Sequence, residues 1–254
     1  FQEKTKEAFR YFLKESKKDG QGIAYLKQER GISEATIRLF QSQGALAEGV
    51  NHSKDGYSEP VLAFKSYNAE EQLVGATFQG IVFNPDRYPK KGRMKLILPN
   101  SDGYRGVKVT LGEQPKHFIF AESPIDLMSY LDLHPELYNE NVQLVSMNGL
   151  KEGVIYQTLK DQFNPNYPGT AEEYFKDLDA KMNAQIALEK GFKMTLAIDN
   201  DAGAQRFVER FRPKHFPVVL DLPPKEANEE KKDWNDMLLE SREKAEEIDA
   251  EFTE

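Results

Sequence analysis

The chain has 254 residues, of which 39% are hydrophobic, and this is enough to bury a core in one large domain or two smaller ones. It contains no cysteine, which excludes disulfides and thiolate metal sites. It also has no apolar stretch long enough to span a bilayer and no signal-peptide pattern, so we expect no membrane partner. Together these features lead us to expect a soluble, cytoplasmic protein. The formal net charge of −8 argues at first sight against a nucleic-acid partner.

Helical patterns occupy the first part of the chain. Residues 4–18 carry apolar side chains at helical spacing and are followed by Asp-Gly, so we predict a helix there. A second amphipathic segment covers residues 22–29. Ser33 is expected to cap a third helix, whose Ile37 and Phe40 face inward.

Short strands separated by turn residues follow, from about residue 60 to residue 110. Two apolar runs flank the polar segment 68–71, which predicts a β-hairpin. Residues 95–98 and 106–110 are expected to form two further strands around a turn at 99–103. We therefore predict an antiparallel or mixed β unit in this part of the chain.

After Pro115 the pattern changes to alternating strands and helices, which implies a parallel sheet with right-handed crossovers. A boundary near residues 112–115 thus divides the chain into a mixed N-terminal part, 1–114, and an α/β C-terminal part, 115–254. The strands are expected at 117–121, 143–147, 194–198 and 217–220, and the last helix at 234–250.

The negative charge is concentrated at one end of the chain. Residues 221–254 hold 13 acids against five bases, which accounts for the whole net charge. Residues 87–108, by contrast, hold seven bases and one acid. This basic strip has the charge of a phosphate-binding surface, although a solvated, lysine-rich hairpin accounts for it equally well. Its bases are Arg87, Lys90, Lys91, Arg93, Lys95, Arg105 and Lys108.

Two of the predicted strands end in carboxylates. Glu122 follows the strand at 117–121, and Asp199 and Asp201 follow the strand at 194–198. If these strands are neighbours, the three side chains converge at the carboxyl edge of the sheet, where α/β proteins place their sites. Three hard oxygen ligands would suit Mg²⁺ there, and Glu122 could instead act as a general base.

Other acids lie close to these in the sequence. Asp126 is one turn into the helix after Glu122. There it can orient the metal-binding carboxylates without binding the ion itself, or it can serve only as a first-turn acid favoured by the helix dipole. Asp233 and Asp236 are weaker metal candidates, and an N-cap role at the last helix accounts for them equally well. Trp234 is expected to anchor that helix by packing.

The pattern of Glu-x-x-x-Asp after one strand and Asp-x-Asp-x-x-Gly after another resembles the Toprim domain of bacterial primases, topoisomerases and some nucleases. Residues 24–37 also look like the helical entry to the polymerase core of bacterial primases, and Lys-Asp-Trp-Asn-Asp at 232–236 looks like their late acidic motif. Glu-Ser-Pro-Ile-Asp at 122–126 replaces the primase Glu-Gly pattern. This makes the chain most similar to the primase-like Toprim proteins of conjugative and mobile elements.

The resemblance implies an α/β fold with a Toprim-type parallel sheet and flanking helices, preceded by a mixed α+β primase-core-like N-terminal subdomain. It implies Mg²⁺, for which Mn²⁺ can substitute, bound by the catalytic acids Glu122, Asp199 and Asp201, with Asp126 and Asp236 as further metal ligands. It also implies contacts to the phosphates of nucleic acid or of a nucleotide from Lys90, Lys91, Arg93, Lys95, Arg105 and Lys108.

The function that follows is Mg²⁺-dependent, primase-like nucleotidyl transfer on single-stranded DNA in the DNA processing of a plasmid or conjugative element. The expected partners are single-stranded DNA and nucleotides, together with other replication or transfer proteins. A Toprim nuclease or nicking enzyme and a non-catalytic DNA-binding module of a mobilisation apparatus stay open as alternatives. The chain begins at Phe1 rather than at a methionine, so we expect it to be a piece of a longer protein.

Overall fold

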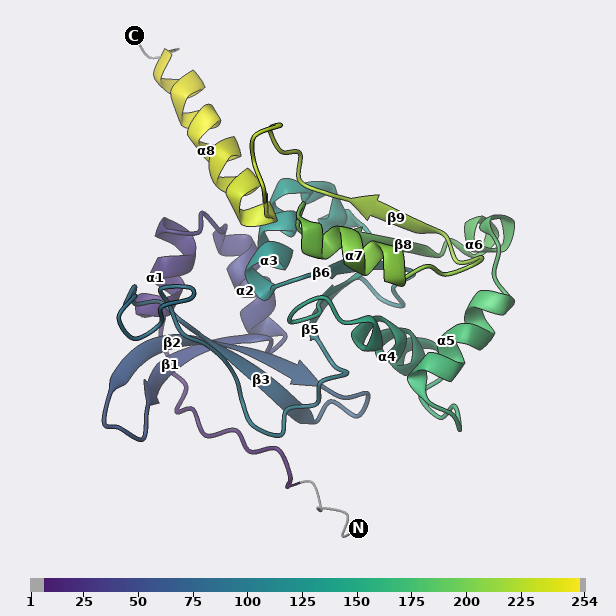
Figure 1. The fold of residues 1–254 in the computed structure, drawn as a ribbon, viewed down its shortest axis with the longest axis horizontal. Helices are drawn as coiled ribbons and strands as arrows, with labels where there is room; N and C mark the ends of the chain where they lie inside the picture. Colours follow the sequence, from purple (N-terminus) through teal and green to yellow (C-terminus); the bar gives the residue numbers. More distant parts are fainter. Residues whose placement is uncertain (1–6, 252–254) are drawn as a thin grey trace.

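The computed structural model describes residues 7–251 and contains two β-sheets with helices packed against them (Figure 1). The first part of the chain contains α1 (Gln21–Gln28), α2 (Glu34–Ser42), β1 (Leu46–His52), β2 (Ser58–Tyr67), β3 (Leu73–Gly80) and β4 (Lys95–Ile97). The second part contains β5 (Val107–Leu111), β6 (His117–Ala121), α3 (Pro124–Leu133), η1 (Pro135–Asn139), β7 (Val142–Ser146), α4 (Glu152–Phe163), α5 (Ala171–Ala180), α6 (Ala184–Lys190), β8 (Lys193–Ala197), α7 (Ala202–Arg210), β9 (Val218–Asp221) and α8 (Trp234–Glu251). Within the described residues, no helix combines the length and the apolar character needed to cross a membrane.

The N-terminal segment does not form the predicted helix. Residues 4–6 lie outside the described part of the chain, and residues 7–19 contain no helical turn. Instead, Glu15 forms an isolated antiparallel bridge with Gly49 of β1, and Leu13 packs into the core of the first sheet. The prediction was wrong because apolar side chains at helical spacing can also pack against a sheet, and such tertiary contacts override a weak local preference.

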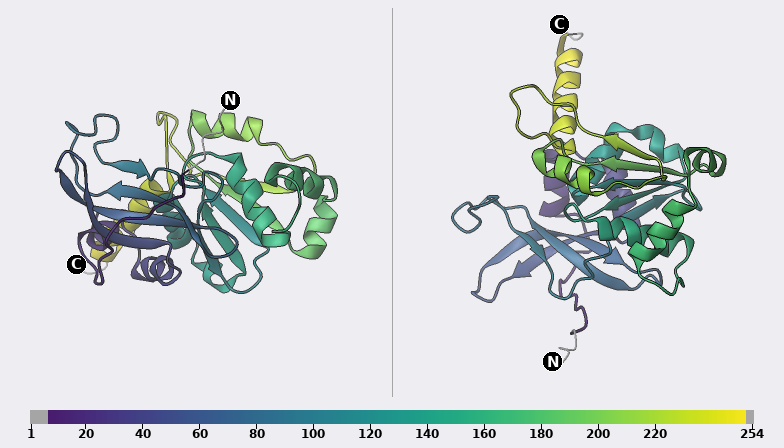
Figure 2. Two further views of the ribbon diagram at one scale, coloured as in Figure 1. Left: turned by 90° about the horizontal axis from the view of Figure 1, so that it is seen from below. Right: turned by 45° about the vertical axis from the view of Figure 1, so that its right-hand side comes forward.

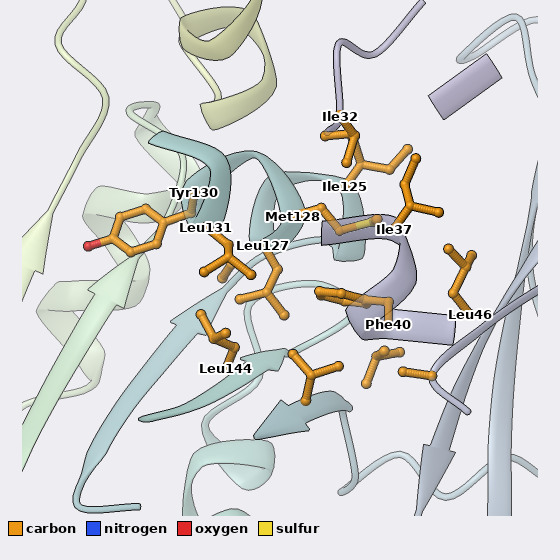
Figure 3. Packing of buried hydrophobic residues seen from close by; sticks show 14 of the residues in the cluster. Ile32, Ile37, Phe40, Leu46, Ile125, Leu127, Met128, Tyr130, Leu131 and Leu144 are labelled. Carbon is orange, nitrogen blue, oxygen red and sulfur yellow. The ribbon is translucent and has the colours of Figure 1, made fainter. Parts of the chain in front are cut away.

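The next two helices form where the sequence predicts them. Ser33 caps α2, since its Oγ accepts a hydrogen bond from the backbone N–H of Thr36 at 3.2 Å. Ile37 and Phe40 are fully buried, and Figure 3 shows them directed toward the side chains of α3.

The strand β1 was missing from the sequence prediction. Glu48 lies in the middle of this strand and interrupts its apolar pattern, yet its side chain is buried. The carboxylate accepts hydrogen bonds from the backbone N–H groups of Gly20 and Gly22, which would otherwise lack acceptors at the start of α1. Because the groups that bond to Glu48 lie more than 20 residues earlier in the chain, the sequence around Glu48 does not show that it is buried in a strand.

The first sheet is antiparallel, with the order β1-β2-β3-β4. β2 and β3 form the predicted hairpin around residues 68–71. The two further predicted strands do not belong to one β unit, because β4 pairs with β3 whereas β5 pairs antiparallel with β7 of the second sheet. Burial explains the difference: β4 is exposed along its length, while Val107, Val109 and Leu111 of β5 face the core.

The second sheet has the order β5-β7-β6-β8-β9. The strands β7, β6, β8 and β9 are mutually parallel, as predicted for the C-terminal part, and β5 is an antiparallel edge. The strands β6 and β8 are direct neighbours, and Ala121 lies opposite Ala197 at their carboxyl ends. The adjacency that the candidate site requires is therefore confirmed.

Helices cover both faces of the second sheet (Figure 2). Ile119 of β6 faces a core that contains residues of α2, α3 and the start of α8, whereas Phe118 and Phe120 face α4, α5 and α7. Trp234 is 2% exposed and packs edge-on against Tyr130 of α3, which confirms its anchoring role. Leu238 is also buried in this core, and the C-terminal part of α8 projects away from the body of the molecule (Figure 1).

Candidate functional site

Two strand ends carry the site. Glu122 follows the last residue of β6, and Asp199 comes two residues after the end of β8. Because β6 and β8 are parallel neighbours in register, the chain leaves both strands at the same edge of the sheet. The sequence predicted that Glu122, Asp199 and Asp201 converge at this edge, and the structure brings the first two of them into one pocket.

The start of α3 adds a third acid. Ser123 caps this helix: its Oγ accepts a hydrogen bond from the backbone N–H of Asp126 at 3.2 Å, and its hydroxyl donates to the carboxylate of the same residue. Pro124 suits the first helical position, because a backbone N–H there would have no acceptor within the helix and proline has none. This cap holds the Asp126 side chain, which is 7% exposed, against the end of the sheet.

These acids line a pocket of about 490 Å³ at the edge of the sheet. Four acids and five bases face the same space. The acids are Glu122, Asp126, Asp199 and Asp233, and the bases are Arg30, Lys91, Arg93, Lys95 and Lys231. We call this the carboxylate pocket. Its mixed charge suits a ligand that carries phosphates together with a cation.

Asp199 is the most deeply buried acid of the pocket, with 2% exposure. Its Oδ2 lies 2.6 Å from Nζ of Lys231. Its Oδ1 is buried and finds no hydrogen-bond partner among the residues that the structure describes. A buried carboxylate oxygen without a partner is costly, and a bound cation would remove that cost.

Burial and mutual repulsion change the protonation of the acids. Burial raises the pKa of Asp126 to about 8, and the charges of Asp199 and Asp233 act in the same direction. Burial also raises the pKa of Glu122, and the negative charge of Asp199 raises it further. The pKa of Asp199 is raised by burial in spite of the opposing hydrogen bond from Lys231. Such shifts are common where acids gather at functional sites.

The donor set fits a divalent cation. Carboxylate oxygens are the ligands that Mg²⁺ prefers, and Mg²⁺ usually keeps several waters while one or two carboxylates hold it. In residues 7–251, however, no three acidic or histidine side chains stand close enough to enclose a metal ion by themselves. The pocket thus offers carboxylates for a hydrated ion rather than a closed cage, and the assignment of individual metal ligands stays a prediction.

Two of the predicted metal ligands do not line the pocket. Asp201 is the N-cap of α7, where its Oδ1 accepts a hydrogen bond from the backbone N–H of Ala204 at 2.8 Å. Asp233 and Asp236 bond reciprocally at the start of α8, as the N-cap interpretation expected. Of these two, Asp233 also faces the carboxylate pocket and Asp236 does not.

The basic strip is divided between separate surfaces. Lys91, Arg93 and Lys95 line the carboxylate pocket and, together with Lys90, an adjoining groove of about 570 Å³. Partial desolvation beside the pocket and the charge of Lys91 lower the pKa of Lys95, although Asp126, Glu122 and Asp199 act in the opposite direction. The strip therefore borders the acids only along its first half.

The second half of the strip faces a different pocket. Arg105 and Lys108 line a smaller space of about 160 Å³ beside α4. Nε of Arg105 lies 3.0 Å from Asp161, and its guanidinium also pairs with Asp102. Arg105 is thus engaged in ion pairs that join α4 to the loop between β4 and β5.

Lys231 was missed by sequence reasoning. The segment directly after it, 232–236, was noted only for its acids. The signal available in the sequence was a pair of lysines directly before those acids. What brings Lys231 to Asp199 is a backbone bridge between Asn200 and Lys232, which pairs segments that are far apart in the chain.

The chain is similar to a curated protein and to solved primase structures. No family model matches the chain. An uncharacterized protein of Bacillus anthracis is 31% identical over 220 residues, which cover 84% of this chain. The chain spans about half the length of that relative, 55%.

Solved structures of primases are similar at low identity. The primase fragment of the bacteriophage T7 primase-helicase protein is 13% identical, covering 85% of this chain and 69% of that chain with a TM-score of 0.45. The DnaG primase catalytic domain bound to ssDNA is 13% identical, covering 74% of this chain and 69% of that chain with a TM-score of 0.37. Function is therefore inferred below from the geometry of the site.

Proposed function

We propose that this chain is a divalent-metal-dependent enzyme of nucleic acid, and that its reaction is primase-like nucleotidyl transfer on single-stranded DNA. One observation carries the proposal: two strand-end acids, Glu122 and Asp199, share a pocket with Lys91, Arg93 and Lys95. Acids that can hold a cation and bases that can hold phosphates are the two parts that phosphoryl transfer needs. The resemblance of residues 122–126 to mobile-element proteins supports a role in plasmid or conjugative DNA processing.

The charges of the pocket residues indicate a role for each of them. When bound, Mg²⁺ would neutralise the negative charge that develops on the transferred phosphoryl group and align the attacking oxygen. Glu122 and Asp199 would supply its carboxylate ligands, and the unpartnered Oδ1 of Asp199 is the first candidate atom. Burial raises the pKa of Asp126, which favours its neutral form when no cation is bound and so lowers the repulsion among the acids of the pocket. Lys91, Arg93 and Lys95 would bind the phosphates of the template or of a nucleotide.

A template assay tests the proposal. Single-stranded DNA of mixed sequence is incubated with labelled NTPs and Mg²⁺ or Mn²⁺. Labelled products that grow from the nucleotides support primase-like transfer. Shortened DNA would support the nuclease alternative, and binding to DNA with neither product would support the non-catalytic module.

Substitutions connect the activity to the pocket. Glu122→Gln and Asp199→Asn should each lower the rate at least about 100-fold, because each removes a charged ligand of the cation. Glu209→Gln is the matched control, since Glu209 is exposed on α7 and does not line the pocket. Full activity in both pocket variants would refute the site.

A further inference from the structure

The loop between β9 and α8, residues 222–233, is fixed next to the carboxylate pocket. The backbone N–H of Asn200 donates to the carbonyl of Lys232 at 2.8 Å, and the N–H of Lys232 donates back at 3.3 Å. The side chain of Asn200 also donates to the carbonyl of Pro223 at 3.0 Å. These three bonds hold both ends of the loop beside the residue that follows Asp199.

The two lysines of this loop have different surroundings. Lys232 is buried, and its ammonium pairs with Glu229 and Glu240, away from the pocket. Lys231 faces the acids instead, with Nζ at 2.6 Å from Oδ2 of Asp199. Lys231 is therefore the cation of the loop that meets the candidate metal ligand.

Lys231 is charged and able to move. A lysine ammonium keeps its charge at neutral pH, and this one lies 2.6 Å from Oδ2 of Asp199. Its side chain is 50% exposed, whereas the side chain of Asp199 is 3% exposed. The lysine can thus turn its ammonium into solvent once another cation pairs with Asp199, while the carboxylate cannot follow it.

We propose that Lys231 is a resident cation of the pocket, which occupies the place in front of Asp199 until a divalent ion displaces it. This inference rests on the proposed function, since it takes the pocket to be a divalent-cation site. The ammonium neutralises part of the acid cluster in the absence of the ion. A dication near Asp199 and an ammonium 2.6 Å from the same carboxylate repel each other. Binding of the ion therefore releases Lys231, which frees its ammonium to contact a phosphate of the substrate.

Mn²⁺ affinity tests the proposal without any need for activity. Isothermal titration calorimetry is carried out with the wild-type chain, with Lys231→Met and with Lys225→Met. Lys225 lies in the same loop, but its ammonium bonds to the backbone carbonyl of Glu230 at 3.2 Å, so it is the matched control. We expect Lys231→Met to bind Mn²⁺ about tenfold more tightly, because it removes a competing charge at a half-exposed position. Lys225→Met should bind like the wild type.

The other outcomes are equally informative. If Lys231→Met binds Mn²⁺ as the wild type does, or more weakly, the resident-cation proposal is overturned while the metal site stands. If neither protein binds Mn²⁺, the metal site and this inference both fail. Lys231→Gln repeats the test with a polar side chain in case the methionine variant does not fold, and circular dichroism checks the folding of each variant. A purely structural role of Lys231 would change stability and leave the Mn²⁺ affinity unchanged.

Discussion

Replacement of Asp126 by Asn provides a direct test of the electrostatics of the carboxylate pocket. Asp126 is 7% exposed, and its pKa in the folded protein is raised to about 8. An unfolded chain would give an aspartate pKa of about 3.9. Asn has nearly the size of protonated Asp and can still accept the hydrogen bond from Ser123, so Asp126→Asn mimics the neutral acid at every pH.

The sign and size of the effect follow from linkage. Because the pKa is higher in the folded state, the stability that protonated Asp126 contributes is fully present below about pH 4 and is lost as the pH rises toward 8. Each pH unit in this window corresponds to about 1.4 kcal/mol. Between pH 5 and pH 7 the wild type should therefore lose about 3 kcal/mol of unfolding free energy relative to Asp126→Asn.

Urea denaturation in the presence of EDTA, at pH 5, 6 and 7, measures this difference. Asp86→Asn is the control, because Asp86 is exposed and does not line the pocket. This control should show no such trend. A difference between wild type and Asp126→Asn that stays constant from pH 5 to pH 7 would refute the electrostatic description of the pocket.

Other substitutions test the fold and the basic surface. Glu48→Ala should lower the unfolding free energy by about 2–4 kcal/mol, because two backbone N–H groups at the start of α1 lose their acceptor. Urea denaturation measures this loss, and a value below about 1 kcal/mol would contradict the expectation. Asp179→Ala should have a similar cost in thermal denaturation, since Asp179 accepts three backbone N–H bonds from the segment before β9. Lys95→Met should weaken binding to single-stranded DNA and reduce the slope of log K against log salt by about 0.7, as measured by fluorescence anisotropy. Lys116→Met, directly before β6 at the opposite edge of the sheet, should leave that slope unchanged.

Local patterns in the sequence predicted the elements whose cause is local. Ser33 caps α2 because its side chain reaches an N–H only three residues away. The hairpin around 68–71 forms because turn residues separate two apolar runs. The buried strands of the second sheet are recognisable as apolar runs, and Glu122 and Asp199 lie one and two residues after the ends of two of them. These features depend on residues close together in the chain, so periodicity and turn chemistry suffice to find them.

Tertiary structure decided which of these parts meet. Residues 7–19 pack on a sheet instead of forming a helix, and β5 joins the second sheet rather than the first. Asp126 enters the carboxylate pocket, whereas Asp201 is held by the helix that it caps. Lys231 reaches Asp199 across 31 intervening positions, which no local pattern could reveal. The physical reason is the same each time: burial and ion pairing are settled between segments distant in the chain, whereas helix, strand and turn preferences act over a few residues.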